Sequence, residues 1–158
     1  MPEFKPPRPG EIAIDMPPPT DAGLRFIGRI RSAYPTPADC PKNTADRTEP
    51  AAIEIDPIYA AGLEGIGDYS HLVVLVWLDA SRRDLVVQAP RHLERPMGVF
   101  ALRSPVRPNP IGMSVVEVTG WAGTRIDIRA TDFANGTPVI DLKPYLPRID
   151  AVPGARGR

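Results

Sequence analysis

The seven residues Leu72–Leu78, LVVLVWL, are all apolar, and most of them are β-branched or aromatic. Side chains of this kind are enriched in strands, and a continuous apolar run is typical of a strand that is buried on both faces. The run is too short for a membrane-spanning helix, which needs about 20 apolar residues. The sequence therefore predicts a central strand here.

Shorter strand-like segments lie on both sides of this run. Before it, Arg25–Arg31 (RFIGRIR) predicts a first strand, and Ile53 and Ile55 alternate with charged residues as in a short strand. After it, the predicted strands are Ser114–Val118, Arg125–Arg129 (RIDIR, with Ile126 and Ile128 inward) and Val139–Leu142. Asp56 and Pro57 are typical of the start of a short helix, which Gly62 or Gly65 would end.

Prolines are unusually frequent, with 21 in 158 residues, against about 5% in average proteins. They favour stiff turns and disfavour long helices. Many short strands with such turns predict a mainly β fold, a small closed or nearly closed β-barrel with one or two short helices.

The ends of the chain are rich in proline and glycine and show no apolar periodicity. We expect a flexible N-terminal arm over 1–22, one barrel domain over 23–148 and a flexible C-terminal tail over 149–158. The start has no apolar core of a signal peptide, and no run is long enough to span a bilayer. The sequence predicts a soluble, cytoplasmic protein with no membrane partner.

The net charge is zero, so the chain as a whole does not resemble a basic nucleic-acid-binding protein. Locally, Arg82–Arg107 holds six arginines and His92 against Asp84 and Glu94. This excess is either a solvated face or a contact with RNA phosphates. The single cysteine, Cys40, excludes an internal disulfide, and no metal site is expected because the histidines and carboxylates are scattered.

The stretch 103–112, RSPVRPNPIG, carries Arg103 and Arg107 on a backbone that prolines make stiff. Arginine suits carboxylate or phosphate, and an ordered loop loses less entropy on binding. The alternative is a proline-rich loop with solvated arginines. Chemistry alone does not separate a small anionic ligand from an RNA backbone.

The stretch 131–147, TDFANGTPVIDLKPYLP, contains the turn signal Asn135-Gly136. Asp132, Thr137 and Asp141 have the chemistry to bind ribose hydroxyls or an amino group. The alternative is a plain β-turn between two strands, with Asp141 and Lys143 as a surface pair. Neither GxGxxG nor a P-loop occurs in the sequence.

Residues 98–109, GVFALRSPVRPN, closely resemble the core motif of the TsaA-like (TrmO) family of S-adenosylmethionine-dependent methyltransferases. Three further stretches resemble the family in order: IGRIRSAYPTPADCPKN (27–43), LEGIGDYSHLVVLVWL (63–78) and NGTPVIDLKPYLP (135–147). The resemblance spans roughly residues 24–147. It implies methylation of N6 of threonylcarbamoyl-adenosine 37, beside the anticodon of threonine tRNA.

The resemblance also implies a small barrel and a homodimer with S-adenosylmethionine pockets close to the subunit interface. The cofactor-binding residues carried over are Pro41, Lys42, Asn43, Asp79, Arg103, Met113, Asp132, Phe133, Ala134, Asn135, Gly136 and Thr137. The expected catalytic residues are Arg107 and, as the general base, Asp141, with the substrate's own carboxylate as the alternative base. Arg107, Asn109, Lys143 and Tyr145 are the expected substrate contacts. Arg107 and Asn109 would either shape the motif loop or face the substrate.

The sequence departs from the family pattern at several places. Asp79-Ala80 stands where members often have His-Gln, and Asn43 stands where a glutamine is common. Longer bacterial members have a second, C-terminal domain that is expected to be missing here. Two alternatives therefore stay open: a methyltransferase acting on another RNA or small-molecule acceptor, and a non-catalytic S-adenosylmethionine-binding sensor or adaptor.

Overall fold

The computed structural model describes residues 5–18, 23–45 and 47–157. The chain divides into two compact units. The small-sheet unit comprises Met1–Arg25 and Trp77–Gly112, and the barrel unit comprises Phe26–Val76 and Met113–Arg158. The expected boundaries at 22 and 148 do not coincide with this division, because residues 77–112 group with the N-terminal stretch.

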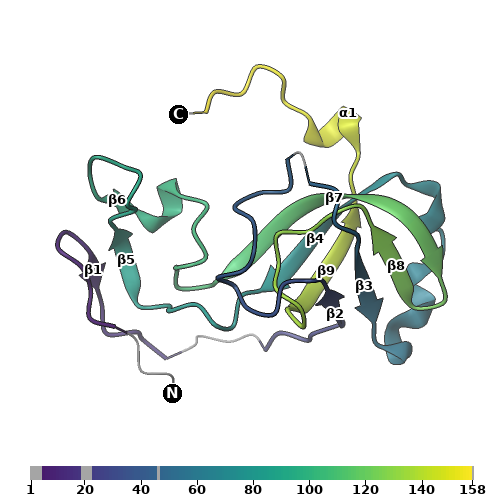
Figure 1. Cartoon of the computed structure of the whole chain (residues 1–158), viewed down its shortest axis with the longest axis horizontal. Helices are drawn as coiled ribbons and strands as arrows, with labels where there is room; N and C mark the ends of the chain where they lie inside the picture. Colours follow the sequence, from purple (N-terminus) through teal and green to yellow (C-terminus); the bar gives the residue numbers. More distant parts are fainter. Residues whose placement is uncertain (1–4, 19–22, 46, 158) are drawn as a thin grey trace. The chain divides into compact units, whose positions relative to one another are not determined.

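Six strands close into the predicted barrel in the order β2-β3-β8-β7-β4-β9 (Figure 1). Their bounds are β2 Gly28–Arg31, β3 Ala51–Ile55, β4 His71–Trp77, β7 Ile111–Ala122, β8 Arg125–Ile128 and β9 Pro138–Pro144. Closure leaves no unpaired strand edge in the ring. The mainly β fold class is therefore confirmed.

The interior of the barrel is filled by alternate residues of the strands. Ile126 and Ile128 face inward as predicted and are 0% and 1% exposed, and Ile30 and Ile53 are fully buried. Strand β4 differs from the prediction, because its buried residues alternate with half-buried ones instead of being buried on both faces. A closed barrel has only one interior, so the other face of the strand points out of it.

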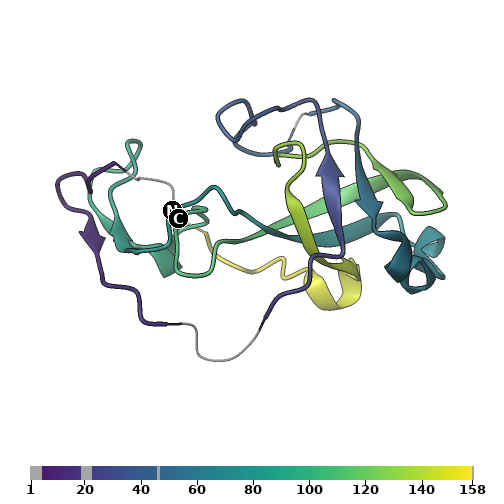
Figure 2. The same cartoon turned by 90° about the horizontal axis from the view of Figure 1, so that it is seen from below.

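The predicted helix after Asp56 exists as a 3-10 helix, η1 Pro57–Leu63, with Asp56 as a cap that makes no side-chain hydrogen bond. Two more 3-10 turns, η2 Ile66–Asp68 and η3 Val99–Ala101, and a four-residue α-helix, α1 Pro147–Asp150, complete the helical content of the described residues. Figure 2 shows η1 and η2 as a compact coil at one end of the barrel. Among the described residues, no helix has the length and apolar character needed to cross a bilayer.

The small-sheet unit contains three short strands in the order β1-β5-β6, namely Ile12–Ala13, Leu85–Gln88 and Met97–Gly98. Strand β1 lies inside the stretch that was expected to be a flexible arm, so that expectation fails for its described part. The reason is specific anchoring: Ile14 N–H donates to Asp84 O at 2.8 Å, and the Glu11 side chain is only 5% exposed. Residues 1–4 and 19–22 of the expected arm lie outside the described residues.

Candidate functional site

In the small-sheet unit, Arg107 fastens the motif loop, residues 103–112, to the segment before it. Its Nη2 donates to the carbonyl oxygens of Val99, at 2.7 Å, and of Leu102. Its Nε is buried and makes no hydrogen bond within the described part of the chain. Of the two roles that the sequence left open for Arg107, the structure shows the loop-shaping one, whereas Arg103 is exposed.

Arg83 also holds the motif loop, a role that the sequence analysis did not predict. Its Nε donates to Pro108 O at 2.6 Å and its Nη2 to Asn109 Oδ1 at 3.4 Å. The guanidinium stacks over Trp77, 5.2 Å from the ring centroid. The only sign of this role in the sequence was that Arg83 belongs to the arginine-rich stretch. The contact itself could not be predicted, because its two residues are 25 positions apart in the chain.

The arginine-rich stretch is therefore not a uniform cationic face. Arg82 makes a bidentate pair with Asp84, at 2.8 and 2.7 Å, and donates to Lys5 O at 2.8 Å. This pair lowers the pKa of Asp84. Arg82 and Arg83 thus hold the small-sheet unit together, and Arg91 and Arg95 are the exposed arginines between them and the motif loop.

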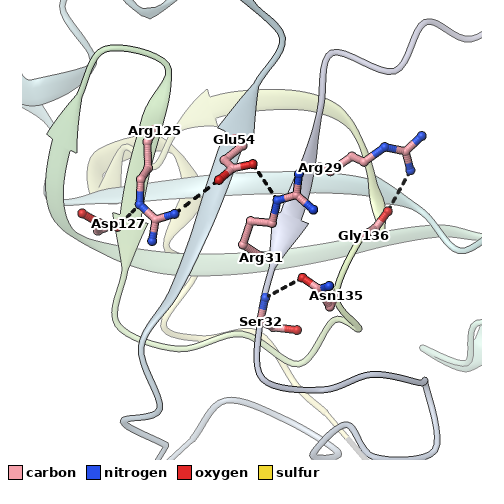
Figure 3. A network of polar contacts seen from close by, with 8 residues as sticks. All are labelled: Arg29, Arg31, Ser32, Glu54, Arg125, Asp127, Asn135 and Gly136. Atoms are coloured by element: carbon pink, nitrogen blue, oxygen red, sulfur yellow. Dashed lines mark hydrogen bonds and ion pairs between the residues drawn. The ribbon is translucent and has the colours of Figure 1, made fainter.

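In the barrel unit, the predicted cofactor turn 132–137 is fastened to the loop that precedes β3. Asn135 N–H donates to Tyr34 O at 2.7 Å. Its Oδ1 accepts a hydrogen bond from Ser32 N–H at 3.3 Å (Figure 3). Ser32 Oγ also donates to Phe133 O at 2.9 Å. The turn itself is the predicted one, since Gly136 has φ 80°, a value that favours glycine.

The surroundings of Cys40 indicate that the loop carrying Pro41, Lys42 and Asn43 lies near this turn. Burial raises the pKa of the Cys40 thiol, and the carboxylates of Asp132 and Asp39 raise it further. A thiol with a raised pKa is protonated at neutral pH and is a weak nucleophile. Because the Asp132 carboxylate acts on Cys40, the loop 40–43 lies near the turn 132–137, and both are predicted cofactor segments.

The expected base Asp141 lies on β9 in an ion pair with Lys143, at 2.7 Å between Oδ2 and Nζ. Its Oδ1 accepts a hydrogen bond from Leu142 N–H at 3.0 Å. Both residues line a cavity of about 500 Å³ together with Tyr59 and Tyr69. The residues that were expected around the cofactor are not among those that line this cavity.

The other predicted residues are distributed over both units. Asp79, Arg103, Arg107 and Asn109 belong to the small-sheet unit, and Pro41–Asn43, Met113, 132–137, Asp141, Lys143 and Tyr145 belong to the barrel unit. Asp79 is exposed in the turn after β4, and Met113 is 49% exposed on β7. Within the described ranges, no group of three or more metal-ligating side chains is placed to hold an ion.

Comparison with known proteins gives this barrel a family. Residues 29–151 match the family described as the tRNA-methyltransferase O N-terminal domain. The chain belongs to this family, so the resemblance seen in its motifs is confirmed.

Two relatives carry names that specify a ligand. The "Probable S-adenosyl-L-methionine-binding protein VirR" of Rhizobium radiobacter is 39% identical over 87% of this chain and 78% of its own length. The "S-adenosyl-L-methionine-binding protein" of Archaeoglobus fulgidus is 38% identical, over 85% of this chain and 97% of its own.

A solved structure shows the same fold. The crystal structure of TrmO from Pseudomonas aeruginosa matches with a TM-score of 0.71 and 34% identity, covering 87% of this chain. The match covers 61% of the TrmO chain, so the present chain corresponds to less than two thirds of that protein.

Proposed function

We propose that the protein is an S-adenosylmethionine-dependent methyltransferase that modifies tRNA at N6 of threonylcarbamoyl-adenosine 37. The observation that carries this proposal is the family match over residues 29–151, in a barrel that agrees with the TrmO structure. The names of the relatives support the cofactor, and the name of the family supports tRNA as the substrate class.

The residues present fit the proposed cofactor. Asp132 offers a carboxylate to ribose hydroxyls, and the neighbouring Phe133, 7% exposed, supplies an apolar wall. In the barrel unit, Met113 adds a second apolar side chain on β7. In the small-sheet unit taken by itself, Arg103 is an exposed cation of the kind that binds a carboxylate. Asp79, in the small-sheet unit, is an exposed carboxylate at the position where family members often have a histidine.

S-adenosylmethionine supplies a methyl group that its sulfonium already activates, so the protein has mainly to position the acceptor. The acceptor N6 lies in a urea-like group and must lose a proton, which Asp141 or the substrate's own threonyl carboxylate accepts. Since backbone carbonyls engage the guanidinium of Arg107, Lys143 is the better cation for that carboxylate. Tyr145 follows Lys143 closely and is half-buried, at the end of β9.

We infer further that the protein is a homodimer, and the outer face of β4 and β7 supports this. The bonds from Leu78 N–H to Pro110 O and from Val118 N–H to Ser70 O fit one antiparallel register. In that register Val73 lies beside Val115 and Leu75 beside Met113. Val115 and Met113 are 42% and 49% exposed, so an apolar face is left open on the outside of the barrel unit.

The rim of this face favours a second copy as the partner. Lys143 pairs in register with Val73, and Asp141 pairs with Leu75. One edge of the apolar face thus carries one cation and one anion side by side. In a two-fold interface each surface meets its own copy, and an edge that carries both charges can meet itself without bringing only like charges together.

The first experiment is calorimetric titration of the purified protein with S-adenosylmethionine, comparing the wild type with Arg103→Ala. We expect the substitution to weaken binding about tenfold or more, or roughly 1.4 kcal/mol. Arg148→Ala, at an exposed arginine of α1, is the control and leaves the affinity unchanged. No binding by the wild type would overturn the proposal.

Methyl transfer then separates the proposed substrate from two alternatives. Transfer to threonine tRNA supports the proposal, and transfer only to other RNA or to small molecules identifies a different acceptor. The names of the two relatives described above, which specify binding and not catalysis, support one further candidate, a non-catalytic sensor or adaptor. That candidate requires cofactor binding without transfer to any RNA pool.

A further inference from the structure

A polar hollow of about 250 Å³ lies on the barrel unit and borders the predicted cofactor turn 132–137. Its polar lining comes from the end of β2, from β7, from β8 and from the turn 132–137: Arg31, Ser32, Thr119, Arg125, Asp127 and Asn135. The lining holds two arginines and one aspartate. Glu54, beside them, balances their charge, so the hollow offers an anion the donor groups of the arginines and not a net positive charge.

One carboxylate holds both arginines in place. Glu54 accepts from Arg31 Nε at 2.6 Å through Oε2 and faces Arg125 Nη1 at 3.4 Å through Oε1 (Figure 3). Asp127 Oδ1 accepts from Arg125 Nε at 2.8 Å. The two side chains are still 46% and 51% exposed. Their orientation is thus set before any ligand arrives, while water or a ligand still reaches them.

Each guanidinium keeps donors for a ligand. Within the described residues, the hydrogen bond of Arg31 is made through Nε, so both of its Nη atoms are available. Arg125 uses Nε and Nη1, which leaves Nη2. Asn135 accepts from Ser32 N–H through Oδ1, which leaves its amide nitrogen as a donor. Arginine donors on a fixed frame match the oxygens of a phosphate group.

The cations also extend along the strand. Arg29 lies on the same outer face of β2 as Arg31, two residues away, and its Nη1 donates to Gly136 O at 2.9 Å (Figure 3). A row of exposed cations suits a polymer with repeated phosphates better than a single small anion. The row of cations leads to Asn135 and Gly136, which belong to the turn that we assign to the cofactor.

We infer that this hollow, with Arg31 and Arg125 as its main cations, binds a backbone phosphate of the RNA substrate next to the methyl-transfer site. The inference rests on the proposed function. It assigns part of the tRNA contact to the barrel unit, whereas the sequence pointed only to the arginine-rich stretch 82–107. Phosphate contacts of this kind position a nucleic acid without reading its bases.

The test is the affinity of the full chain for a labelled threonine-tRNA anticodon stem-loop over a range of salt concentrations. The Arg31→Gln/Arg125→Gln variant is compared with Arg129→Gln/Arg148→Gln, which removes two other exposed arginines of the same unit. Arg129 is 55% exposed, close to the tested arginines, and like Arg31 it has one ion pair, with Glu117. Titration with S-adenosylmethionine, which we expect to be unchanged in both variants, shows that each protein is folded.

We expect the Arg31/Arg125 variant to bind the stem-loop about tenfold more weakly and to lower the salt slope by about 0.7–0.9 per lost phosphate contact. The control variant keeps the wild-type slope, and Arg31→Lys/Arg125→Lys restores most of it because the charge returns. Equal affinities and slopes for the two glutamine variants would overturn the inference alone. A wild type that binds S-adenosylmethionine but no tRNA would overturn both the inference and the proposed substrate.

Discussion

The guanidinium of Arg107 donates to two backbone carbonyl oxygens of the segment before it, on Val99 and Leu102. Val99 is fully buried, so its carbonyl has no access to water if the donor is lost. An unsatisfied buried polar group is costly, which explains why an arginine stands inside a proline-rich loop. Arg103 is exposed and remains the proposed contact for a ligand.

We predict that Arg107→Lys lowers the free energy of unfolding by about 1–3 kcal/mol, because one ammonium group does not reach both carbonyls in the same geometry. Urea denaturation measures this value. Arg103→Lys, at an exposed position, is the control and changes stability by less than about 0.5 kcal/mol. A stable Arg107→Lys protein that binds cofactor normally but transfers no methyl group would instead indicate that Arg107 contacts the substrate.

Cys40 tests whether the loop 40–43 lies against the turn 132–137. Burial and the carboxylates of Asp132 and Asp39 raise the thiol pKa. We predict that Asp132→Asn lowers that pKa, because it removes a negative charge that disfavours the thiolate. The rate of alkylation by iodoacetamide, followed from pH 7 to 10, then rises at lower pH than in the wild type.

Asp127→Asn is the matched control, since Asp127 lies on β8 and does not contribute to the pKa of Cys40. Its alkylation profile should overlay that of the wild type. If Asp132→Asn also left the profile unmoved, the two predicted cofactor segments would not be neighbours in solution.

Among the elements, β2 depends on a single glycine. Gly28 pairs with Ile55 of β3 on one side and with Val139 of β9 on the other. A Cβ at this position would come within 2.1 Å of the backbone oxygen of Glu54. The backbone approaches too closely for any side chain, so β2 closes the barrel only with glycine here.

We predict that Gly28→Ala destabilises the protein by at least about 1–3 kcal/mol, because β2 and β3 must move apart. Thermal unfolding followed by circular dichroism measures the loss. Gly62→Ala in η1 is the control, because a Cβ there meets no atom within 4 Å. An equal effect of the two substitutions would contradict the close approach.

Strand β1 is held in place by the carboxylate of Glu11. Hydrogen bonds from the Arg8 side chain and backbone lower the pKa of Glu11 from 4.5 to about 2, and Ala89 N–H also donates to it. The folded-state pKa lies below the unfolded one, so this stabilisation is complete above pH 4.5 and is lost as the pH falls towards 2. The pair of Asp84 with Arg82, which lowers the pKa of Asp84, acts in the same direction.

We predict that the amide of Ile14, which bonds to Asp84 O, loses protection from hydrogen exchange as the pH falls from 4.5 to 2. Protection factors are compared, so that the intrinsic pH dependence of exchange cancels. Glu11→Gln weakens protection already at pH 7 and flattens the profile, whereas Glu94→Gln, at an exposed residue, leaves it unchanged. A wild-type profile that is flat over this range would contradict this role of Glu11.

At the scale of the whole molecule, the proposed dimer places its apolar contact on β4 and β7. We predict that Val115→Glu converts the dimer to a monomer, because a charge would be buried in an apolar interface. Light scattering after size-exclusion chromatography measures the mass. Ile149→Glu, at a 72% exposed apolar residue of α1, should stay dimeric, and a wild type that is monomeric at micromolar concentration would contradict the proposal.

The sequence by itself determined the barrel, its strand positions to within a few residues, the turn at Asn135-Gly136 and the family. These depend on local patterns, such as the alternation that buries Ile126 and Ile128, and on motifs that keep their order along the chain. Strand ends were less well predicted, because β7 extends to Ile111–Ala122 once β4 and β8 pair with it. Pairing partners, unlike residue types, decide where a strand ends.

Only the tertiary structure decided what each charged side chain does. Arg82 and Arg83 belong to one arginine-rich stretch, yet one pairs with Asp84 and the other holds the motif loop. Arg31 and Arg125 are almost a hundred residues apart in the sequence, yet both form ion pairs with Glu54 and line one hollow. A charged side chain acts through the groups within a few ångströms of it, and folding, not sequence order, brings those groups together.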